Sequence, residues 1–179
     1  MNLYVLRHAS AGIRRTNPLL DVKRPLDRDG KRHCLQLAHI LNALNVQFDL
    51  IISSPLKRSL QTASLVGTET GYEAQVLLSS ALAPTAIFLD FQKLLHEYAE
   101  VENLLVVGHN PNLTSFLGSL IVPSSARAVA QVRLRKGSLA RVNLTRGPAT
   151  LQWMLDPRIV RSLYATSTRK PRRRKTARK

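Results

Sequence analysis

The chain has 179 residues, 44% of them hydrophobic, which suits one globular domain with a full-sized core. Its single cysteine excludes an intramolecular disulfide and an all-cysteine metal cluster. No apolar run approaches the roughly 18 residues of a membrane span, and the first apolar run is too short for a signal peptide. We therefore expect a cytoplasmic protein.

Positive charge is concentrated at the C-terminus. The formal net charge is +16, and residues 169–179 carry half of it, because they hold five arginines, three lysines and no acidic residue. From Thr166 onward no large apolar side chain could anchor the chain, so we expect a domain over residues 1–165 and a disordered basic tail over residues 166–179. The domain is itself basic, and such a field attracts anions.

The expected elements begin with Leu3–Leu6, four apolar residues typical of a short strand. Residues 9–30 are polar and lack periodicity, which predicts a long loop, and loops of that length are often functional. Apolar residues at helical spacing predict a helix over residues 31–44. A second buried strand follows at residues 50–52, and Pro55 introduces the next helix.

Strands and helices continue to alternate in the second half of the chain. Apolar strands in such an alternation predict a largely parallel sheet covered on both faces, and a late hairpin would extend or edge it. The expected elements are strands at 74–78 and 104–107, helices with apolar faces at 87–98 and 113–121, and hairpin strands at 138–144 and 149–155 joined by residues 145–148.

Cationic side chains follow three of these strands. Arg7 and His8 follow the first, Arg58 lies one turn into the helix after the second, and His109 follows the fourth. The carboxyl ends of parallel strands form one edge of a sheet, where ligands bind, so we expect these four side chains to converge. Helix N-termini add backbone donors there. The sequence therefore predicts a pocket for a phosphoryl group, to which Arg24 of the long loop is a further candidate, with a surface role equally open.

These residue types favour a covalent mechanism. Imidazole is a competent nucleophile, so a neutral His8 can attack phosphorus in line and form a phosphohistidine that water then hydrolyses. Arg7 and Arg58 would hold the phosphoryl oxygens, and His109 would donate a hydrogen bond to the developing charge. The histidines and the cysteine show no metal-ligand spacing, so we expect neither a metal nor another cofactor.

Three segments at these strand ends carry a family resemblance: Leu-Arg-His-Ala at 6–9, Ser-Ser-Pro-Leu-Lys-Arg-Ser-Leu-Gln-Thr-Ala at 53–63, and Val-Gly-His-Asn-Pro at 107–111. In this order they resemble the three motifs of the histidine phosphatase superfamily, which is phosphoglycerate-mutase-like. The resemblance covers roughly residues 1–155. It implies a three-layer α/β/α sandwich with a mostly parallel central sheet, with His8 as nucleophile and with Arg7, Arg58 and His109 completing the phosphate pocket.

Two departures narrow the resemblance. Ala9 stands where the family usually has glycine, and residues 78–86, where many members carry an acidic proton donor, contain no acid. The compact length, the Arg24-Pro25-Leu26 segment and the stretch at residues 153–157 are similar to the small bacterial phosphohistidine phosphatases. That similarity implies phosphohistidine on signalling or phosphotransfer proteins as substrate.

The missing acid fits this substrate. An alkyl phosphate ester leaves as a very basic alkoxide that must be protonated during the reaction. Histidine phosphoramidate leaves as imidazole, which is expelled more easily and can be protonated beforehand. An enzyme without a general acid is therefore handicapped on esters and suited to phosphohistidine.

Two alternatives remain open at this point. A broad phosphomonoesterase acting on a small phosphorylated metabolite would need an acid, for which Asp27, Asp29 and Asp90 are the candidates. A non-catalytic module would use the basic body and tail to bind nucleic acid or a phosphoprotein. The tail contains no aromatic residue, which disfavours base stacking by it.

Overall fold

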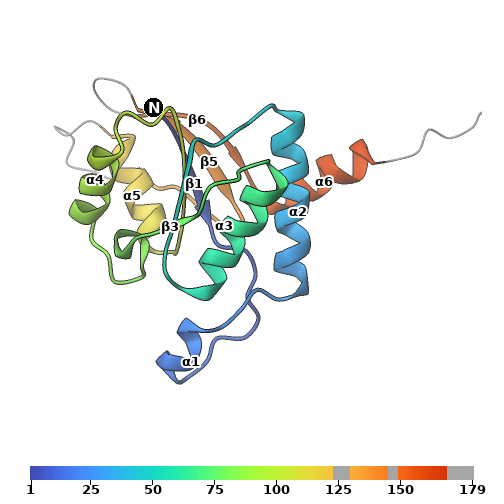
Figure 1. Cartoon of the computed structure of the whole chain (residues 1–179), viewed down its shortest axis with the longest axis horizontal. Helices are drawn as coiled ribbons and strands as arrows, with labels where there is room; N and C mark the ends of the chain where they lie inside the picture. The colour runs from blue at the N-terminus through green and yellow to red at the C-terminus, as the bar shows by residue number, and fades with distance from the viewer. Residues whose placement is uncertain (123–129, 145–148, 169–179) are drawn as a thin grey trace, which may run out of the picture.

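The computed structural model describes residues 1–122, 130–144 and 149–168 (Figure 1). Within these ranges, six strands form one sheet. The strands are β1 (Asn2–Arg7), β2 (Leu50–Ser53), β3 (Leu77–Leu78), β4 (Asn103–Gly108), β5 (Leu139–Asn143) and β6 (Thr150–Leu155).

The sheet has the order β3-β2-β4-β1-β5-β6. The first four strands in this order pair in parallel, whereas β5 is antiparallel to β1 and β6 is antiparallel to β5. The expectation of a mostly parallel sheet extended by a late hairpin is therefore confirmed. The turn predicted at residues 145–148 lies outside the described residues.

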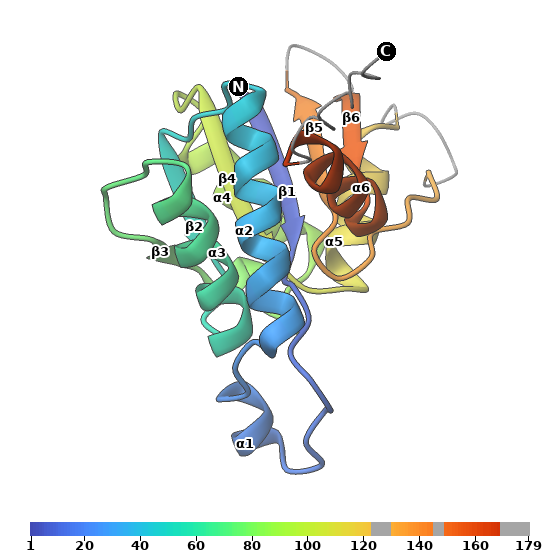
Figure 2. The ribbon, with the colours of Figure 1, turned by 90° about the vertical axis from the view of Figure 1, so that its right-hand side faces the viewer.

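Helices cover both faces of the sheet (Figures 1 and 2). Side chains alternate along β1, so that Leu6 packs with α2, α3 and α6 in one apolar cluster and Val5 packs with α4 and α5 in the other. This arrangement confirms the three-layer α/β/α sandwich. The helices are α1 (Pro18–Val22), α2 (Arg28–Ala43), α3 (Lys57–Glu69), the 3₁₀ turn η1 (Ser80–Leu82), α4 (Phe88–Glu97), α5 (Asn112–Leu120) and α6 (Pro157–Ser167).

Some predicted bounds were wrong. The long loop at residues 9–30 contains the short helix α1, which Asn17 caps through its side chain. Ile87 is the N-cap of α4 and largely exposed, so it does not belong to the helix's buried face. The strand predicted at residues 74–78 is shorter in the structure, where β3 has only two residues and pairs with β2 through Leu77 and Leu78.

Helix α6 was not predicted. Asp156 caps it through its side chain, but Val160 is its only fully buried residue, so its apolar periodicity is faint in the sequence. The helix continues through Ser167, and residues 169–179 of the predicted tail lie outside the described residues. In the part of the chain that the structure describes, no helix combines the length and apolar character of a membrane span.

Candidate active site

A cavity of about 990 Å³ opens at the carboxyl edge of the parallel strands. Arg7 and His8 reach it from the end of β1, Arg58 from the first turn of α3, and His109 from the turn after β4. The structure thus brings together all four side chains that the topology places at this edge. Helices α3 and α5 both begin beside the cavity without a side-chain N-cap bond, so their first backbone N–H groups add positive potential there.

His8 is held in a form suited to nucleophilic attack. Its Nδ1 lies 2.8 Å from the carbonyl oxygen of Ala9, which can only accept, so Nδ1 carries the proton and Nε2 keeps its lone pair. Burial is the main cause that lowers the pKa of His8 to about 3; the bond to Ala9 opposes it, and the positive charges of Arg58, Arg7 and Lys136 add to the lowering. The imidazole is therefore neutral at physiological pH.

His109 faces His8 across the cavity floor. The two ring centroids are 4.9 Å apart, and His109 Nε2 lies 2.9 Å from the hydroxyl oxygen of Ser54. Burial, with His8 and the arginines as further causes, lowers the pKa of His109 to about 3. A serine just before a helix is typical of an N-cap, but Leu56 is the N-cap of α3, and the Ser54 hydroxyl lies against His109.

Both motif arginines keep donors uncommitted. Arg7 donates from one terminal nitrogen to the Leu134 carbonyl at 2.9 Å, and Arg58 donates to the backbone oxygen of Asp21 at 3.0 Å. The Nε atoms of Arg7 and Arg58 are buried and have no hydrogen-bond partner among the described residues. A buried donor without a partner is costly. Both residues line the cavity, so the other guanidinium nitrogens of Arg7 and Arg58 are candidates to bind the oxygens of a phosphoryl group.

Arg24 lines the cavity wall, but its guanidinium is engaged with the loop. Its Nε lies 2.8 Å from Asp21 Oδ1, and one terminal nitrogen donates to the carbonyls of Ala11 and Gly12. A direct phosphate contact by Arg24 stays a prediction, whereas its role in organising the loop is visible in these bonds.

Asp21 is the residue that the sequence reasoning missed. It is the only carboxylate among the described residues that line the cavity. It lies between Arg24 and Arg58, whose terminal nitrogen is 3.3 Å from Asp21 Oδ2. The backbone N–H of Arg15, followed by the Arg24 side chain, lowers its pKa. The signal available in the sequence was its position three residues before Arg24.

The three acids that the ester hypothesis requires lie elsewhere. Asp27 caps α2 through the Gly30 N–H and accepts from the Ser10 hydroxyl at 2.6 Å with its other oxygen. Asp29 pairs with Arg32 at the surface. Asp90 accepts from the backbone N–H of Ile87. None of the three lines the cavity in the described part of the chain.

We predict that Asp27 acts as a cap and not as a proton donor. Asp27→Asn should keep hydrolysis of a phosphate ester and of a phosphoramidate within about threefold, because asparagine caps helices as well as aspartate does. Asp27→Ala should lower the free energy of unfolding by about 1 kcal/mol. Urea unfolding and initial rates measure the two effects, and a large loss of ester hydrolysis in both variants, with phosphoramidate hydrolysis retained, would identify Asp27 as an acid.

The depressed histidine pKa values predict an acid-sensitive fold. Between the unfolded pKa of 6.5 and the folded value of about 3, the unfolded state binds a proton at His8 that the folded state does not, so stability falls as pH drops through this window. His8→Asn removes that contribution. From pH 7 to pH 5 the variant should lose roughly 2 kcal/mol less of its free energy of unfolding than wild type does, and equal losses in urea titrations would contradict the prediction.

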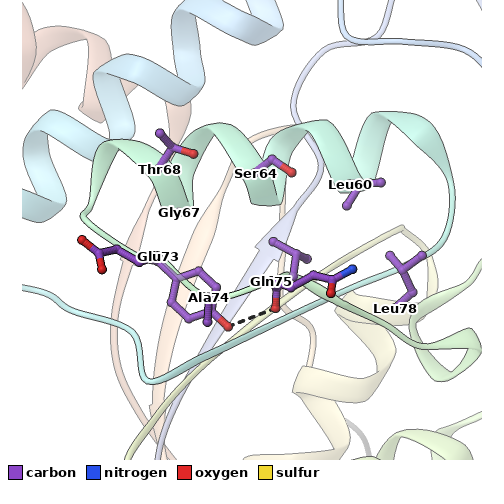
Figure 3. Close-up of a pocket in the computed structure, with 10 residues that line it drawn as sticks. Leu60, Ser64, Gly67, Thr68, Glu73, Ala74, Gln75 and Leu78 are labelled. Carbon is purple, nitrogen blue, oxygen red and sulfur yellow. Dashed lines mark hydrogen bonds between the residues drawn. The ribbon is translucent and has the colours of Figure 1, made fainter.

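A second hollow has a different character. It lies between α3 and the segment that leads into β3, with a volume of about 340 Å³ (Figure 3). Glu73 is the only charged residue that lines it in the described chain, and no histidine or arginine does. Among the described residues, no group of three or more His, Cys, Asp or Glu could hold a metal ion. The anion-binding chemistry is therefore at the cavity that contains His8.

Comparison with known proteins places this geometry in a family. The sequence profile of the histidine phosphatase superfamily (branch 1) matches residues 3–83, which include Arg7, His8, Arg24 and Arg58. An uncharacterized protein from Picosynechococcus sp. is 31% identical over 159 residues, covering 87% of this chain and 92% of that protein. The chain belongs to the histidine phosphatase superfamily. The predicted family is thereby confirmed, and membership supports hydrolase activity on a phosphorylated substrate.

Solved structures with the same fold differ in substrate. The protein histidine phosphatase SixA, complexed with tungstate, aligns with a TM-score of 0.76 and 23% identity over 88% of this chain and 97% of that one. The α-ribazole phosphatase from Shigella flexneri aligns with a TM-score of 0.69 and 19% identity over 88% and 97%. At these identities the likeness shows the fold alone, so the substrate of this histidine phosphatase has to be argued from its own cavity.

Proposed function

We propose that this protein is a cytoplasmic phosphohistidine phosphatase, which removes phosphate from histidine side chains of signalling or phosphotransfer proteins through a covalent intermediate on His8. The observation that carries the proposal is the chemistry of the cavity. It offers a neutral imidazole with its Nε2 lone pair available among arginines, and the one carboxylate among the described residues that line it, Asp21, is engaged by Arg24 and Arg58.

Two displacements at phosphorus make up the proposed reaction. In the first, His8 Nε2 forms a bond to phosphorus while the bond from phosphorus to the substrate imidazole breaks, and that imidazole leaves as a neutral ring because it was protonated beforehand. In the second, a water oxygen attacks phosphorus, the bond to Nε2 breaks, and the water proton passes to solvent. Arg7 and Arg58 would hold the phosphoryl oxygens through both steps, and His109 would contact the phosphoryl group from the side opposite the arginines.

Ester hydrolysis would require a protonated carboxyl at the leaving oxygen. Asp21 is placed near the cavity, but the Arg15 N–H and Arg24 hold its pKa below the usual range, so it is ionised and a poor proton donor. A phosphomonoesterase acting on a small metabolite is therefore the weaker proposal. A purely binding module is weaker still, because binding alone does not require a nucleophilic histidine with an available Nε2.

The substrate proposal predicts a ratio of activities. The protein should hydrolyse a phosphotransfer domain phosphorylated on histidine with a kcat/KM at least about 10²-fold above that for glycerol phosphate, an alkyl ester with a basic leaving group, since one missing general acid typically costs 10²–10⁴-fold on such an ester. Both rates are measured by phosphate release at the same pH. Equal rates, or a faster rate on the ester, would overturn the substrate assignment while leaving family membership intact.

A further inference from the structure

Helix α1 and its flanks project from the body of the molecule (Figures 1 and 2), and residues of this segment line the cavity. No residue of α1 is buried. Four large aliphatic side chains of this projection face solvent, and we refer to them as the α1 tip: Ile13 is 90% exposed, Leu19 77%, Leu20 56% and Val22 46%.

Polar bonds, and not apolar packing, hold the projection in place. Asn17 caps α1 through the Leu19 N–H, Asp21 accepts from the Arg15 N–H at 2.9 Å, and Arg58 donates to the Asp21 carbonyl. The aliphatic side chains of the tip are therefore not needed to fix this conformation. Large apolar side chains gathered on a surface mark interaction sites more often than isolated ones do.

The tip is continuous with the cavity wall. Arg14, Arg15, Pro18 and Val22 line the cavity from the same segment that carries Leu19 and Leu20. A ligand confined to the cavity would not touch Leu19 or Leu20, neither of which lines it. Whatever covers the tip therefore stands at the cavity mouth, where the carrier of the phosphoryl group must also stand.

Charge around the tip indicates the chemistry of its partner. Arg14, Arg15 and Lys23 are exposed in residues 13–25, whereas Asp21, the acid of this segment, is paired with Arg24 and Arg58. The tip therefore has an apolar centre with a cationic border. The complementary partner is a protein surface that exposes aliphatic side chains surrounded by acidic residues.

We propose that the α1 tip is the docking surface for the phosphorylated protein substrate, with Leu19 and Leu20 as its apolar anchors. The inference rests on the proposed function. It adds a surface that would hold the carrier protein while the phosphoryl group on its histidine reaches His8. Free phosphohistidine, which occupies only the cavity, gains nothing from the tip.

The test compares a carrier protein with the free amino acid. For the double variant Leu19→Ser/Leu20→Ser, kcat/KM on a phosphohistidine-bearing phosphotransfer domain should fall about tenfold or more, mainly through KM. On free phosphohistidine it should stay within about twofold. The matched control is Ile159→Ser/Leu163→Ser on α6, a similarly exposed aliphatic pair outside the cavity lining, which should leave both rates unchanged.

The outcomes separate this inference from the function on which it rests. A wild-type enzyme that fails on the phosphorylated domain overturns the proposed function and the docking with it. A wild-type enzyme that is active, with a double variant that loses neither rate or loses both equally, overturns docking alone. Sedimentation of the same samples tests for self-association. If wild type is a dimer and the double variant is a monomer, the tip binds a second copy of the chain and the proposal is overturned. Retained activity on free phosphohistidine shows that the variant is folded.

Discussion

Replacing His8 with alanine is expected to lower kcat by roughly 10⁴-fold or more, the scale on which loss of a nucleophile is felt in covalent enzymes. Among the described residues that line the cavity, the other candidates are engaged, because His109 Nε2 is bonded to Ser54 and the one carboxylate, Asp21, is bonded to arginines. Steady-state phosphate release measures the loss. Incubation with a radiolabelled phosphohistidine protein should leave acid-labile label on wild type and none on His8→Ala.

The control for this prediction is His96→Ala, which removes an exposed histidine of α4 that does not line the cavity. It should keep the wild-type rate. Calorimetry with inorganic phosphate reports on the pocket itself, since Arg7 and Arg58 remain and binding should persist in His8→Ala. If turnover or label survives in His8→Ala, a different residue is the nucleophile. If His8→Ala binds no phosphate, His8→Asn, which better preserves the side-chain volume, tests the same point.

The strand ends could be predicted because their sequence signals are local and strong. Runs such as Leu3–Leu6 and residues 104–107 are apolar on both faces, which is how buried parallel strands appear in a sequence. One topological rule then places the residues after each parallel strand at the same edge of the sheet. Arg7, His8 and His109 meet in the structure for that reason.

The parts that escaped prediction depend on contacts between distant segments. Asp21 lies in a stretch without periodicity, and its importance comes from Arg58, which is far away in sequence. Ser54 has the composition of a helix cap, and only the fold shows that its hydroxyl meets His109. Helix α6 buries too little apolar surface to leave a periodic pattern, although Asp156 and Pro157 gave the usual start signal.

Replacing Arg58 with alanine is expected to lower kcat/KM by about 10²–10³-fold, the usual cost of one oxyanion donor. Arg58 lines the cavity, where its guanidinium would donate to a phosphoryl oxygen. The free energy of unfolding should change by less than the activation free energy does, because Asp21 still accepts hydrogen bonds from the Arg24 side chain and the Arg15 N–H after the substitution. Initial rates and urea unfolding on the same preparation separate the two effects.

Arg58→Lys tests what the guanidinium supplies beyond charge. Lysine keeps the positive charge but lacks the planar fork that can hold two oxygens, so it should recover only part of the loss. Lys57→Ala, which removes the neighbouring exposed cation, is the matched control and should leave kcat/KM within about twofold of wild type if long-range charge is a minor factor. Full recovery by lysine would mean that Arg58 acts as a point charge.

Asp21→Asn distinguishes phosphate binding by Arg58 from anchoring of the loop. The variant keeps the bond from Arg58 to the Asp21 carbonyl but removes the carboxylate that competes with phosphate for the guanidinium. If Arg58 binds phosphate, the affinity for inorganic phosphate should rise by a few-fold, because one negative charge leaves the anion site. If Arg58 serves only to anchor the loop through this carboxylate, Asp21→Asn should instead reproduce the activity loss of Arg58→Ala. Phosphate affinity and initial rates are both measured on Asp21→Asn. A rise in affinity with retained activity makes this ion pair part of the phosphate pocket, whereas lost activity without a rise in affinity makes it only part of the loop.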